Sequence, residues 1–408
     1  MDPILRSHAD AIVSAAIRAV QPDDAVKRAL EGQVFPGRVI LVAAGKAAWQ
    51  MAKAASGCLC IQEGIVITKY GHVMGEIPNC RCFEAGHPVP DENTFTATQE
   101  AVALTAGLSA KDTVLFLLSG GGSALFESPL ISGEELQDIT NQLLASGADI
   151  VQINTIRKRL SSVKGGRFAR HCTPAQVFSI VLSDILGDPL DMIASGPAAP
   201  DSSTCAQAIA IANAYHLKLS SQARSLLEQE TPKELTNVTT QITGSVRELC
   251  NAAAKACREL GYEPVLLTDR LCCQAKEAGS FLSSILKTHA GCGKKLAFIA
   301  GGETVVQLTG TGKGGRNQEL ALAAAEGIAG IPGAAIFSVG SDGTDGPTDA
   351  AGGYVDYETA AALDQQNISI YETLRNNDAY HALKAVNSLI ITGPTGTNVN
   401  DVAVALLK

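Results

Sequence analysis

The sequence predicts an α/β protein with two domains, of which the first contains a Rossmann-like, doubly wound parallel sheet. With 408 residues, the chain exceeds the size at which one hydrophobic core usually stops growing. Apolar, β-rich runs alternate with helical patterns, which is typical of a parallel sheet covered by helices on both faces. Hydrophobic residues make up 46% of the chain and charged residues 18%, as expected for a well-buried fold.

The first domain begins with an amphipathic helix over residues 1–20, and the sheet follows it. Its inward positions are predicted to be Ile4, Leu5, Ala11, Ile12, Ala15 and Ala19. The predicted strands are 38–45, 63–71, 80–86, 112–121 and 176–184. The predicted helices between them are 46–56, 94–107, 133–146 and 155–163. Ser132 and Glu135 form an S-x-x-E capping box, which predicts where the third of these helices begins.

A polar, Thr-rich stretch predicts the domain junction near residue 235, so the domains are expected to be 1–235 and 236–408. The second is a smaller α/β domain with predicted helices 245–260, 274–289 and 316–327 and predicted strands 263–269, 294–303, 304–310 and 334–342. Residues 294–301 and 304–309 are joined too tightly for a helical crossover. We therefore expect an antiparallel pair there, and a mixed sheet.

Charge and composition exclude several classes of partner. The formal net charge of −9 argues against nucleic acid and against anionic membranes, which are bound through clustered Lys and Arg. The N-terminus lacks the apolar centre of a signal peptide, and no apolar run is long enough to cross a bilayer. The eleven cysteines then favour reduced thiols, and we expect a cytoplasmic protein. The oligomeric state stays open, with a homodimer as one alternative.

Two loops that follow predicted strands have the composition of anion sites. Lys46 lies at a helix start directly after a strand, where backbone N–H groups and the helix dipole favour an anion. The glycines of SGGGSALF (119–126) permit close backbone approach to a phosphate or carboxylate, so Gly120, Gly121, Gly122 and Ser123 are candidate ligands. The alternatives are a solvated lysine and a plain turn.

The tetrapeptide Lys-Gly-Gly-Arg occurs twice, at 164–167 and at 313–316. Helical spacing places Asn154 and Lys164 on one face of the segment before and into the first copy, although such a face is more often solvated surface. The second copy lies within GTGKGGRNQEL (310–320), which also satisfies the dinucleotide fingerprint G-x-G-x-x-G. Its preceding strand is polar and no ribose-binding carboxylate follows at the usual distance, so we interpret that match as accidental.

Acidic loops follow two further strands. Asp184, Asp188 and Asp191 stand in one loop, and Asp342, Asp345 and Asp349 stand in the other. Carboxylates beside phosphate-binding loops suggest Mg²⁺, whereas Asp-Gly turns explain such clusters without function. His87 is a candidate for substrate binding, with a structural role as the alternative.

Six motifs, in this order, resemble the class of glycerate 2-kinases that carries a C-terminal MOFRL domain. They are LLSGGGSAL, INTIRKRLSSVKGGRFA, VLSDILGDPLDMIASGP, GGETVVQLTGTGKGGRNQELALAAA, SVGSDGTDGPTDAAGG and GPTGTNVNDVAVAL, and the match runs from about residue 36 to the end. The resemblance implies ATP-dependent phosphorylation of D-glycerate at its 2-hydroxyl, in a cleft between a Rossmann-like domain and a MOFRL domain. The family's active-site lysine falls on Lys46 and its arginine on Arg316.

From these residues we expect the following roles in phosphoryl transfer, which needs mostly positioning and charge cancellation. Lys46 and Arg316 bind the γ-phosphoryl group or the glycerate carboxylate, with His87 and Asn154 as further substrate contacts. The backbone of 120–123 and 164–166, together with Gly312, Lys313 and Gly314, binds the phosphates of ATP. One carboxylate accepts the hydroxyl proton, with Asp184 and Asp345 as candidates, while Asp188, Asp342 and Asp349 are candidates for Mg²⁺; spacing does not decide between the two roles.

Two other functions fit parts of the sequence. A nicotinamide-dependent hydroxypyruvate reductase would use the G-x-G-x-x-G match, and hydroxypyruvate is the keto analogue of glycerate. A non-catalytic sensor of nucleotides or sugar acids would bind the same groups without releasing ADP. The number of acidic and basic candidates favours catalysis over the sensor.

Overall fold

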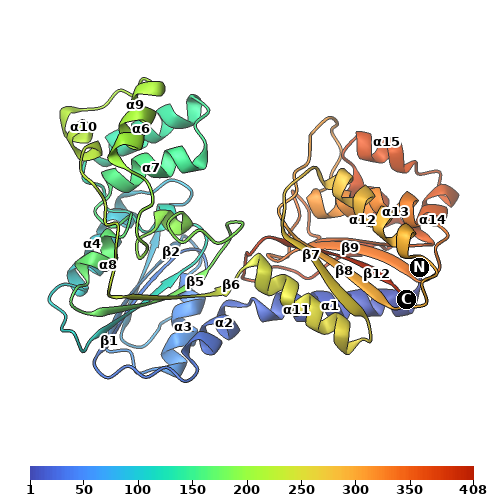
Figure 1. The fold of residues 1–408 in the computed structure, drawn as a ribbon, viewed down its shortest axis with the longest axis horizontal. Coiled ribbons are helices and arrows are strands. Elements are labelled where there is room, and N and C mark those ends of the chain that lie inside the picture. Colours follow the sequence, from blue (N-terminus) through green and yellow to red (C-terminus); the bar gives the residue numbers. More distant parts are fainter. The chain divides into compact units, whose positions relative to one another are not determined.

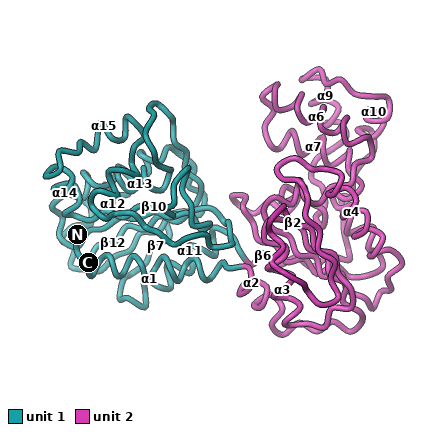
Figure 2. The backbone as a smooth tube through the Cα atoms, turned by 180° about the vertical axis from the view of Figure 1, so that it is seen from behind, with its two compact units in different colours: residues 1–21, 244–408 teal, residues 22–243 magenta.

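The computed structural model describes residues 1–408, which divide into two compact units (Figures 1 and 2). Unit 2 is Pro22–Thr243, and unit 1 joins Met1–Gln21 to Gly244–Lys408. The expected domains 1–235 and 236–408 therefore need two corrections. The first helix belongs to the unit formed by the second half of the chain, because its apolar face is buried there. The Thr-rich stretch after residue 235 is not a linker, because it forms an edge strand of unit 2.

The sheet of unit 2 has the strand order β3-β2-β1-β4-β5-β6. Its strands are β1 (Val39–Ala44), β2 (Glu63–Lys69), β3 (Cys80–Ala85), β4 (Thr113–Leu118), β5 (Gln176–Leu182) and β6 (Val238–Gly244). The pairs from β3 to β5 are all parallel. The order reverses between β1 and β4, and in doubly wound sheets ligands bind at the carboxyl ends of the strands beside such a reversal.

Helices cover both faces of this sheet, as predicted. β1 and β4 are therefore buried on both sides. The helices of unit 2 are α2 (Pro22–Leu30), α3 (Ala48–Cys58), α4 (Glu92–Leu104), α5 (Gly122–Leu125), α6 (Gly133–Ala145), α7 (Ile150–Leu160), α8 (Arg167–His171), η1 (Ile193–Ser195), α9 (Cys205–Ala214) and α10 (Ser221–Leu227). Ser132 caps α6 by accepting the N–H of Glu135, as predicted. The second half of the predicted capping box is not formed, because the Glu135 carboxylate accepts the N–H of Ser220 and not that of Ser132.

The sheet of unit 1 is mixed, with the strand order β11-β10-β9-β12-β8-β7. Its strands are β7 (Glu263–Leu271), β8 (Leu296–Gly302), β9 (Ala334–Gly340), β10 (Gly352–Asp356), β11 (Leu389–Ile390) and β12 (Asp401–Leu407). β7 and β8 are parallel, whereas β12 runs antiparallel to β8 and β9. The mixed sheet is confirmed, but the expected pair of 294–301 with 304–309 is wrong. No strand forms over 304–310, where Val305 is 53% and Leu308 80% exposed because no layer packs on them.

Two helical layers enclose the mixed sheet (Figure 1). The helices of unit 1 are α1 (Pro3–Ala19), α11 (Val246–Glu259), α12 (Ala275–His289), α13 (Arg316–Ile328), α14 (Thr359–Gln365), α15 (Ile370–Arg375) and α16 (Ala379–Ala385). α1 and α11 lie side by side on one face, and α12 and α13 lie on the other. The predicted face of α1 is partly wrong. Leu5 and Ile12 are buried as expected, but Ile4 is exposed, because the buried stripe continues through Ala9, Ala16 and Ile17.

No helix of the structure combines the length and the apolar composition that crossing a membrane requires.

Candidate functional site

Three predicted residues of unit 2 lie at the carboxyl ends of neighbouring strands. Lys46 follows β1, Gly120 follows β4 and Asp184 follows β5. The backbone N–H of Lys46 donates to the carbonyl of Gly120 at 2.9 Å. A Cβ atom at Gly120 would lie only 2.3 Å from Oδ2 of Asp184, so the carboxylate packs directly against the backbone. The reversal between β1 and β4 thus brings a lysine, a glycine loop and an aspartate together.

His87 joins this group across Gly121. Gly121 has a φ of +84°, and a Cβ atom there would lie 3.1 Å from Nε2 of His87 and 3.2 Å from Cγ of Lys46. Burial lowers the pKa of His87, and the positive charges of Lys46 and Lys69 lower it further. The imidazole is therefore neutral at neutral pH, and one ring nitrogen can accept a hydrogen bond from a ligand hydroxyl.

The backbone of Lys46 is fixed from several sides. Its carbonyl accepts a hydrogen bond from Oγ1 of buried Thr68 at 3.3 Å and lies 3.2 Å from Nδ1 of His72. The next N–H, of Ala47, donates to Oγ of Ser119 at 3.0 Å. These bonds hold the start of α3 while the half-exposed Lys46 keeps its ammonium for a ligand. An ammonium at that position supplies a point charge to an anion.

The segment Lys164–Gly166 lies elsewhere than predicted. Lys164 is fully buried, and its ammonium donates to the carbonyls of Ser123 at 2.8 Å and Phe126 at 2.9 Å. The N–H groups of Gly165 and Gly166 donate to the carbonyls of Ser195, the last residue of η1, and Gly196 at 3.0 and 2.7 Å. The prediction that these three residues bind phosphate directly is therefore not supported, because their hydrogen-bond donors are used inside the protein. Charge and glycine content do not reveal which way donors face.

Asn154 is also internal. It is 2% exposed, and its Oδ1 accepts a hydrogen bond from Oγ of Ser195 at 2.7 Å. Oγ of Ser195 lies 3.2 Å from Oγ of Ser123, so this chain of polar groups ends at the glycine loop. Ala194 and Ser195 have φ values of +50° and +63°, which are costly for residues with a Cβ atom. Asn154 therefore supports the glycine loop 119–126 from the interior. The predicted direct contact of Asn154 with substrate is not supported.

The acidic loop after β5 contains one unsatisfied oxygen. Asp188 has a φ of +53°, and its Oδ1 is buried without a hydrogen-bond partner. Asp191 differs, because its Oδ2 accepts from Nζ of Lys158 at 3.2 Å and from Oγ of Ser202 at 2.5 Å. Of Asp188 and Asp191, it is therefore Asp188 that has a buried carboxylate oxygen without a partner.

In unit 1, Arg316 is the first residue of α13 and is held by two acids. Its Nε and Nη2 contact the carboxylate of Asp401 at 2.6 and 3.1 Å, and its Nη1 contacts Glu303 at 2.7 Å. Partial burial disfavours the charge, but the hydrogen bond and negative charge of Asp401, with Glu303, outweigh it and raise the pKa of Arg316. The sequence reasoning missed both acids. Asp401 stood within the last quoted motif, and Glu303 is the last residue of the predicted strand 294–303.

The expected catalytic role of Asp345 is not supported by its position. Its carboxylate accepts the backbone N–H groups of Asn317 at 3.2 Å and Gln318 at 2.9 Å, and their side-chain amides as well. Burial raises the pKa of Asp345, although these donors oppose the shift. With 3% of its surface exposed, Asp345 caps the first turn of α13, and through that turn it positions Arg316.

Packing within unit 1 explains the glycines of the loop 310–315. Cβ atoms at Gly310 and Gly312 would lie 2.4 and 2.5 Å from atoms of the α15–α16 connection. The N–H groups of Gly312 and Lys313 donate to that connection at 2.9 Å each. Nζ of Lys313 lies 4.5 Å from the ring centroid of Tyr380, in a cation–π contact. Because the loop follows no strand and its donors are used, neither a dinucleotide site nor a phosphate cradle at Gly312 and Lys313 is supported.

Comparisons with known proteins agree with the motifs. Residues 8–228 match a family model described as DUF4147, a domain of unknown function, and residues 296–401 match the MOFRL family. The chain is 52% identical to the D-glycerate 2-kinase of Thermotoga maritima, over 99% of this chain and 98% of that protein. This chain belongs to the glycerate kinase family.

Further relatives bear on this membership. The crystal structure of the Thermotoga maritima glycerate kinase superposes with a TM-score of 0.95 at 51% identity, over the full length of both chains. A protein of Agrobacterium vitis named as a putative hydroxypyruvate reductase is 37% identical, over 97% of this chain and 93% of that protein. As a member of the glycerate kinase family, the chain is a phosphotransferase with an alcohol as acceptor, and it uses ATP.

The carboxylates predicted to bind Mg²⁺ form no complete site in this glycerate kinase. No group of three or more His, Cys, Asp or Glu side chains is placed to hold a metal ion. Asp342 accepts the N–H of Thr344 at 2.9 Å, and Asp349 accepts the hydroxyl of Tyr380 at 2.8 Å. Of the three predicted ligands, Asp188 alone has a buried oxygen without a partner.

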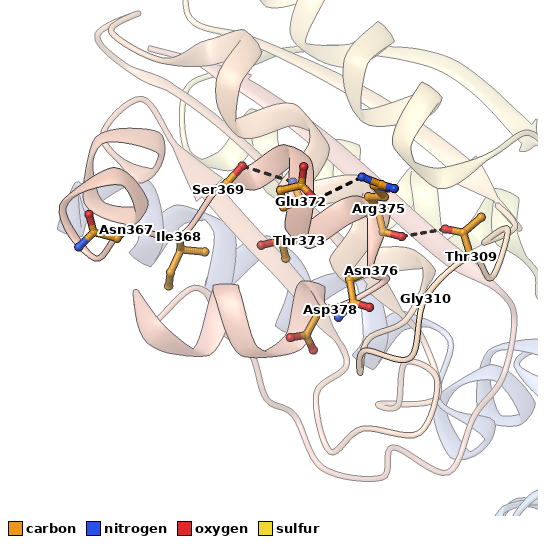
Figure 3. Close-up of a pocket in the computed structure, with 10 residues that line it drawn as sticks. All are labelled: Thr309, Gly310, Asn367, Ile368, Ser369, Glu372, Thr373, Arg375, Asn376 and Asp378. Carbon is orange, nitrogen blue, oxygen red and sulfur yellow. Dashed lines mark hydrogen bonds and ion pairs between the residues drawn. The ribbon is translucent and has the colours of Figure 1, made fainter.

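A cavity of about 960 Å³ lies in unit 1, between the start of the 309–315 loop and the segment 367–378 (Figure 3). Its lining is polar and of mixed charge, formed by Thr309, Gly310, Asn367, Ile368, Ser369, Glu372, Thr373, Arg375, Asn376 and Asp378. Glu372 and Arg375 pair with each other at 3.7 Å, so the cavity has no surplus charge from them to attract a phosphate.

Proposed function

We propose that this glycerate kinase transfers the γ-phosphoryl group of ATP to the 2-hydroxyl of D-glycerate, giving 2-phosphoglycerate and ADP. Family membership supports the class of reaction, and the relative named as a D-glycerate 2-kinase supports the position. The observation that carries the proposal is the convergence of Lys46, His87 and Asp184 around Gly120 and Gly121 at the reversal of the sheet.

In this proposal, Lys46 stabilises negative charge on the oxygens of the transferred group. Gly120 and Gly121 let the phosphates approach the backbone, because neither carries a Cβ atom. Asp184 accepts the proton of the substrate hydroxyl, a role for which Asp345 is too deeply buried. His87 orients the substrate through a neutral imidazole nitrogen. Preorganised charges of this kind supply most of the catalysis of phosphoryl transfer.

The acidic loop after β5 offers the kind of ligand that Mg²⁺ prefers. Mg²⁺ is usually bound by one or two carboxylates, with phosphate oxygens and water completing the octahedron. Asp188, with its unpartnered buried oxygen, would provide the carboxylate. The bound ion would neutralise charge on the phosphate oxygens. Asp342 and Asp349 are weaker candidates, because neither has a buried oxygen without a hydrogen-bond partner.

Arg316 remains a proposed ligand for an anionic group, either the glycerate carboxylate or the transferred phosphoryl. Asp401 and Glu303 fix its guanidinium, which keeps its charge over the whole range of pH in which the protein is folded. Its 32% exposed side chain is still accessible to a ligand.

The decisive test supplies ATP, Mg²⁺ and D-glycerate, with enolase and pyruvate kinase as coupling enzymes and no phosphoglycerate mutase. Enolase accepts 2-phosphoglycerate, so pyruvate should form at once. Pyruvate that forms only after mutase is added would mean phosphorylation at position 3, and would overturn the proposal.

Hydroxypyruvate reductase is the second candidate, because some relatives carry that name. The packing of Gly310 and Gly312 against the α15–α16 connection speaks against a nicotinamide site. Reduced nicotinamide and hydroxypyruvate without ATP should therefore give no loss of absorbance, and steady oxidation of the cofactor would revive this candidate.

A further inference from the structure

Two cations, of which one is fully buried and one is mostly buried, converge on one carbonyl of the glycine loop 119–126. Nζ of Lys164 donates to the carbonyl oxygen of Ser123 at 2.8 Å, and Nη2 of Arg157 donates to the same oxygen at 2.9 Å. Lys164 donates also to the carbonyl of Phe126 at 2.9 Å, so it spans the end of the loop. Lys164 is fully buried, and the side chain of Arg157 is 14% exposed.

These two positive charges share a single negative one. Oε2 of Glu127 lies 3.4 Å from Nζ of Lys164 and 3.6 Å from Nη2 of Arg157. Glu127 is fully buried, and this oxygen accepts no hydrogen bond. Counting one charge for each group, the cluster of Lys164, Arg157 and Glu127 has one positive charge in excess.

An excess buried charge is costly unless something compensates it. Burying an unpaired ion usually costs several kcal/mol, so charges inside proteins are normally matched. Here the excess lies at the loop where the ATP phosphates are proposed to bind, and phosphate is the compensating charge that the reaction supplies. Burial lowers the pKa of Lys164 to about 8, against the pull of Glu127, which still leaves most of the lysine charged at neutral pH.

We propose that Lys164 and Arg157 are positioning residues that hold the end of the glycine loop and give it a positive charge that favours binding of a phosphate-bearing ligand. The proposal rests on the proposed function for the identity of the ligand. The two residues act through the carbonyl of Ser123 and through space, without touching the ligand.

A purely structural role makes a different prediction, and a series of variants separates the two. Lys164→Met reduces the excess charge to zero, Glu127→Gln raises it to two, and the double variant restores it to one. The free energy of unfolding should depend instead on whether each buried charge keeps a partner. Glu127→Gln should be destabilised, because Lys164 and Arg157 both lose their carboxylate. Charge and stability therefore rank the four proteins differently.

The experiment measures binding of ADP by calorimetry at about neutral pH, with adenosine as an uncharged control. Lys164→Met should bind ADP about tenfold more weakly than wild type, the double variant should match wild type, and Glu127→Gln should bind at least as tightly. Adenosine should bind alike to all four. Lys164→Arg keeps the charge and should retain affinity, and Lys111→Met, on the surface of the same unit, is the matched control.

Affinity for ADP that follows the melting temperatures, or that is unchanged in folded Lys164→Met, would overturn the inference. If Lys164→Met does not fold, the comparison of Glu127→Gln with wild type decides, since weaker binding of ADP by the more positive variant contradicts it. Turnover of wild type is a separate result. If wild type forms 2-phosphoglycerate normally but the affinity for ADP is the same in all variants, this inference alone is rejected. If the affinities for ADP follow the charge but wild type has no turnover, the proposed reaction is rejected and the charge effect stands.

Discussion

The buried ammonium of Lys164 should make the stability of unit 2 increase at alkaline pH. Burial lowers its pKa from the ordinary 10.5 to about 8, with Glu127 opposing and Arg157 reinforcing the shift. Between these values the unfolded chain binds a proton that the folded chain does not, so the free energy of unfolding rises with pH. At about 1.36 kcal/mol for each pH unit, the gain is about 3 kcal/mol and is complete near the pKa of the unfolded lysine.

The measurement is urea unfolding of wild type and Lys164→Met at several values between about pH 7 and about pH 10.5. Trp49 is the only tryptophan and belongs to unit 2, so its fluorescence reports the unfolding of that unit. Other groups titrate equally in both proteins. Their contributions cancel when the free energy of unfolding of Lys164→Met is subtracted from that of wild type. That difference should shift in favour of wild type by about 3 kcal/mol over this range. A constant difference would mean that Lys164 is not buried as an ammonium, and would refute the reasoning.

Four further changes test the site and its supports. Lys46→Ala should lower kcat by roughly a hundredfold with unchanged melting, and a near-normal kcat would remove this lysine from the mechanism. Gly120→Ala adds a methyl group 2.3 Å from a carboxylate oxygen and should lower kcat by roughly a hundredfold, whereas Gly57→Ala, with open space around it, should stabilise α3 by about 0.5–1 kcal/mol and leave turnover intact. Arg316→Lys loses a bidentate fork and should reduce kcat/KM by at least about tenfold; equal kcat/KM would show that the fork is not used. Asp345→Ala should cost about 1–2 kcal/mol of unit 1 stability in urea, and unchanged stability would reject its role as the cap of α13.

The fold was predictable where strands are buried on both faces. β1 and β4 are continuous apolar runs, and such runs between helical patterns indicate a parallel sheet. The segment 304–310 has a strand-like alternation, but an alternating pattern forms a strand only where a second layer covers its apolar side. Nothing covers Val305 or Leu308. β6 was missed for the opposite reason, because its polar, half-exposed residues pair along an edge of the sheet.

The site was predictable where topology alone brings residues together. Lys46, Gly120 and Asp184 each follow a strand of one parallel sheet, and the carboxyl ends of such strands meet at one edge. The direction of a side chain does not follow from that rule. Asp345 also follows a strand, yet it turns inward to cap a helix, and its partner N–H groups at 317 and 318 lie far from it in sequence. Asp401, which orients Arg316, follows no strand and is itself the first residue of β12.

The two Lys-Gly-Gly-Arg segments show that one sequence can serve two physical purposes. In the first, the lysine is buried beneath a loop carbonyl, and Arg167 donates to carbonyls of the preceding helix end. In the second, Lys313 lies over an aromatic ring and Arg316 is held by carboxylates at partial exposure. An arginine that donates only to carbonyls compensates backbone dipoles, whereas one fixed by two acids has a defined orientation and a persistent charge. Of the four cations in these segments, Arg316 is therefore the one that we propose to contact a ligand, and Lys164 is the one that we propose to act on a ligand without touching it.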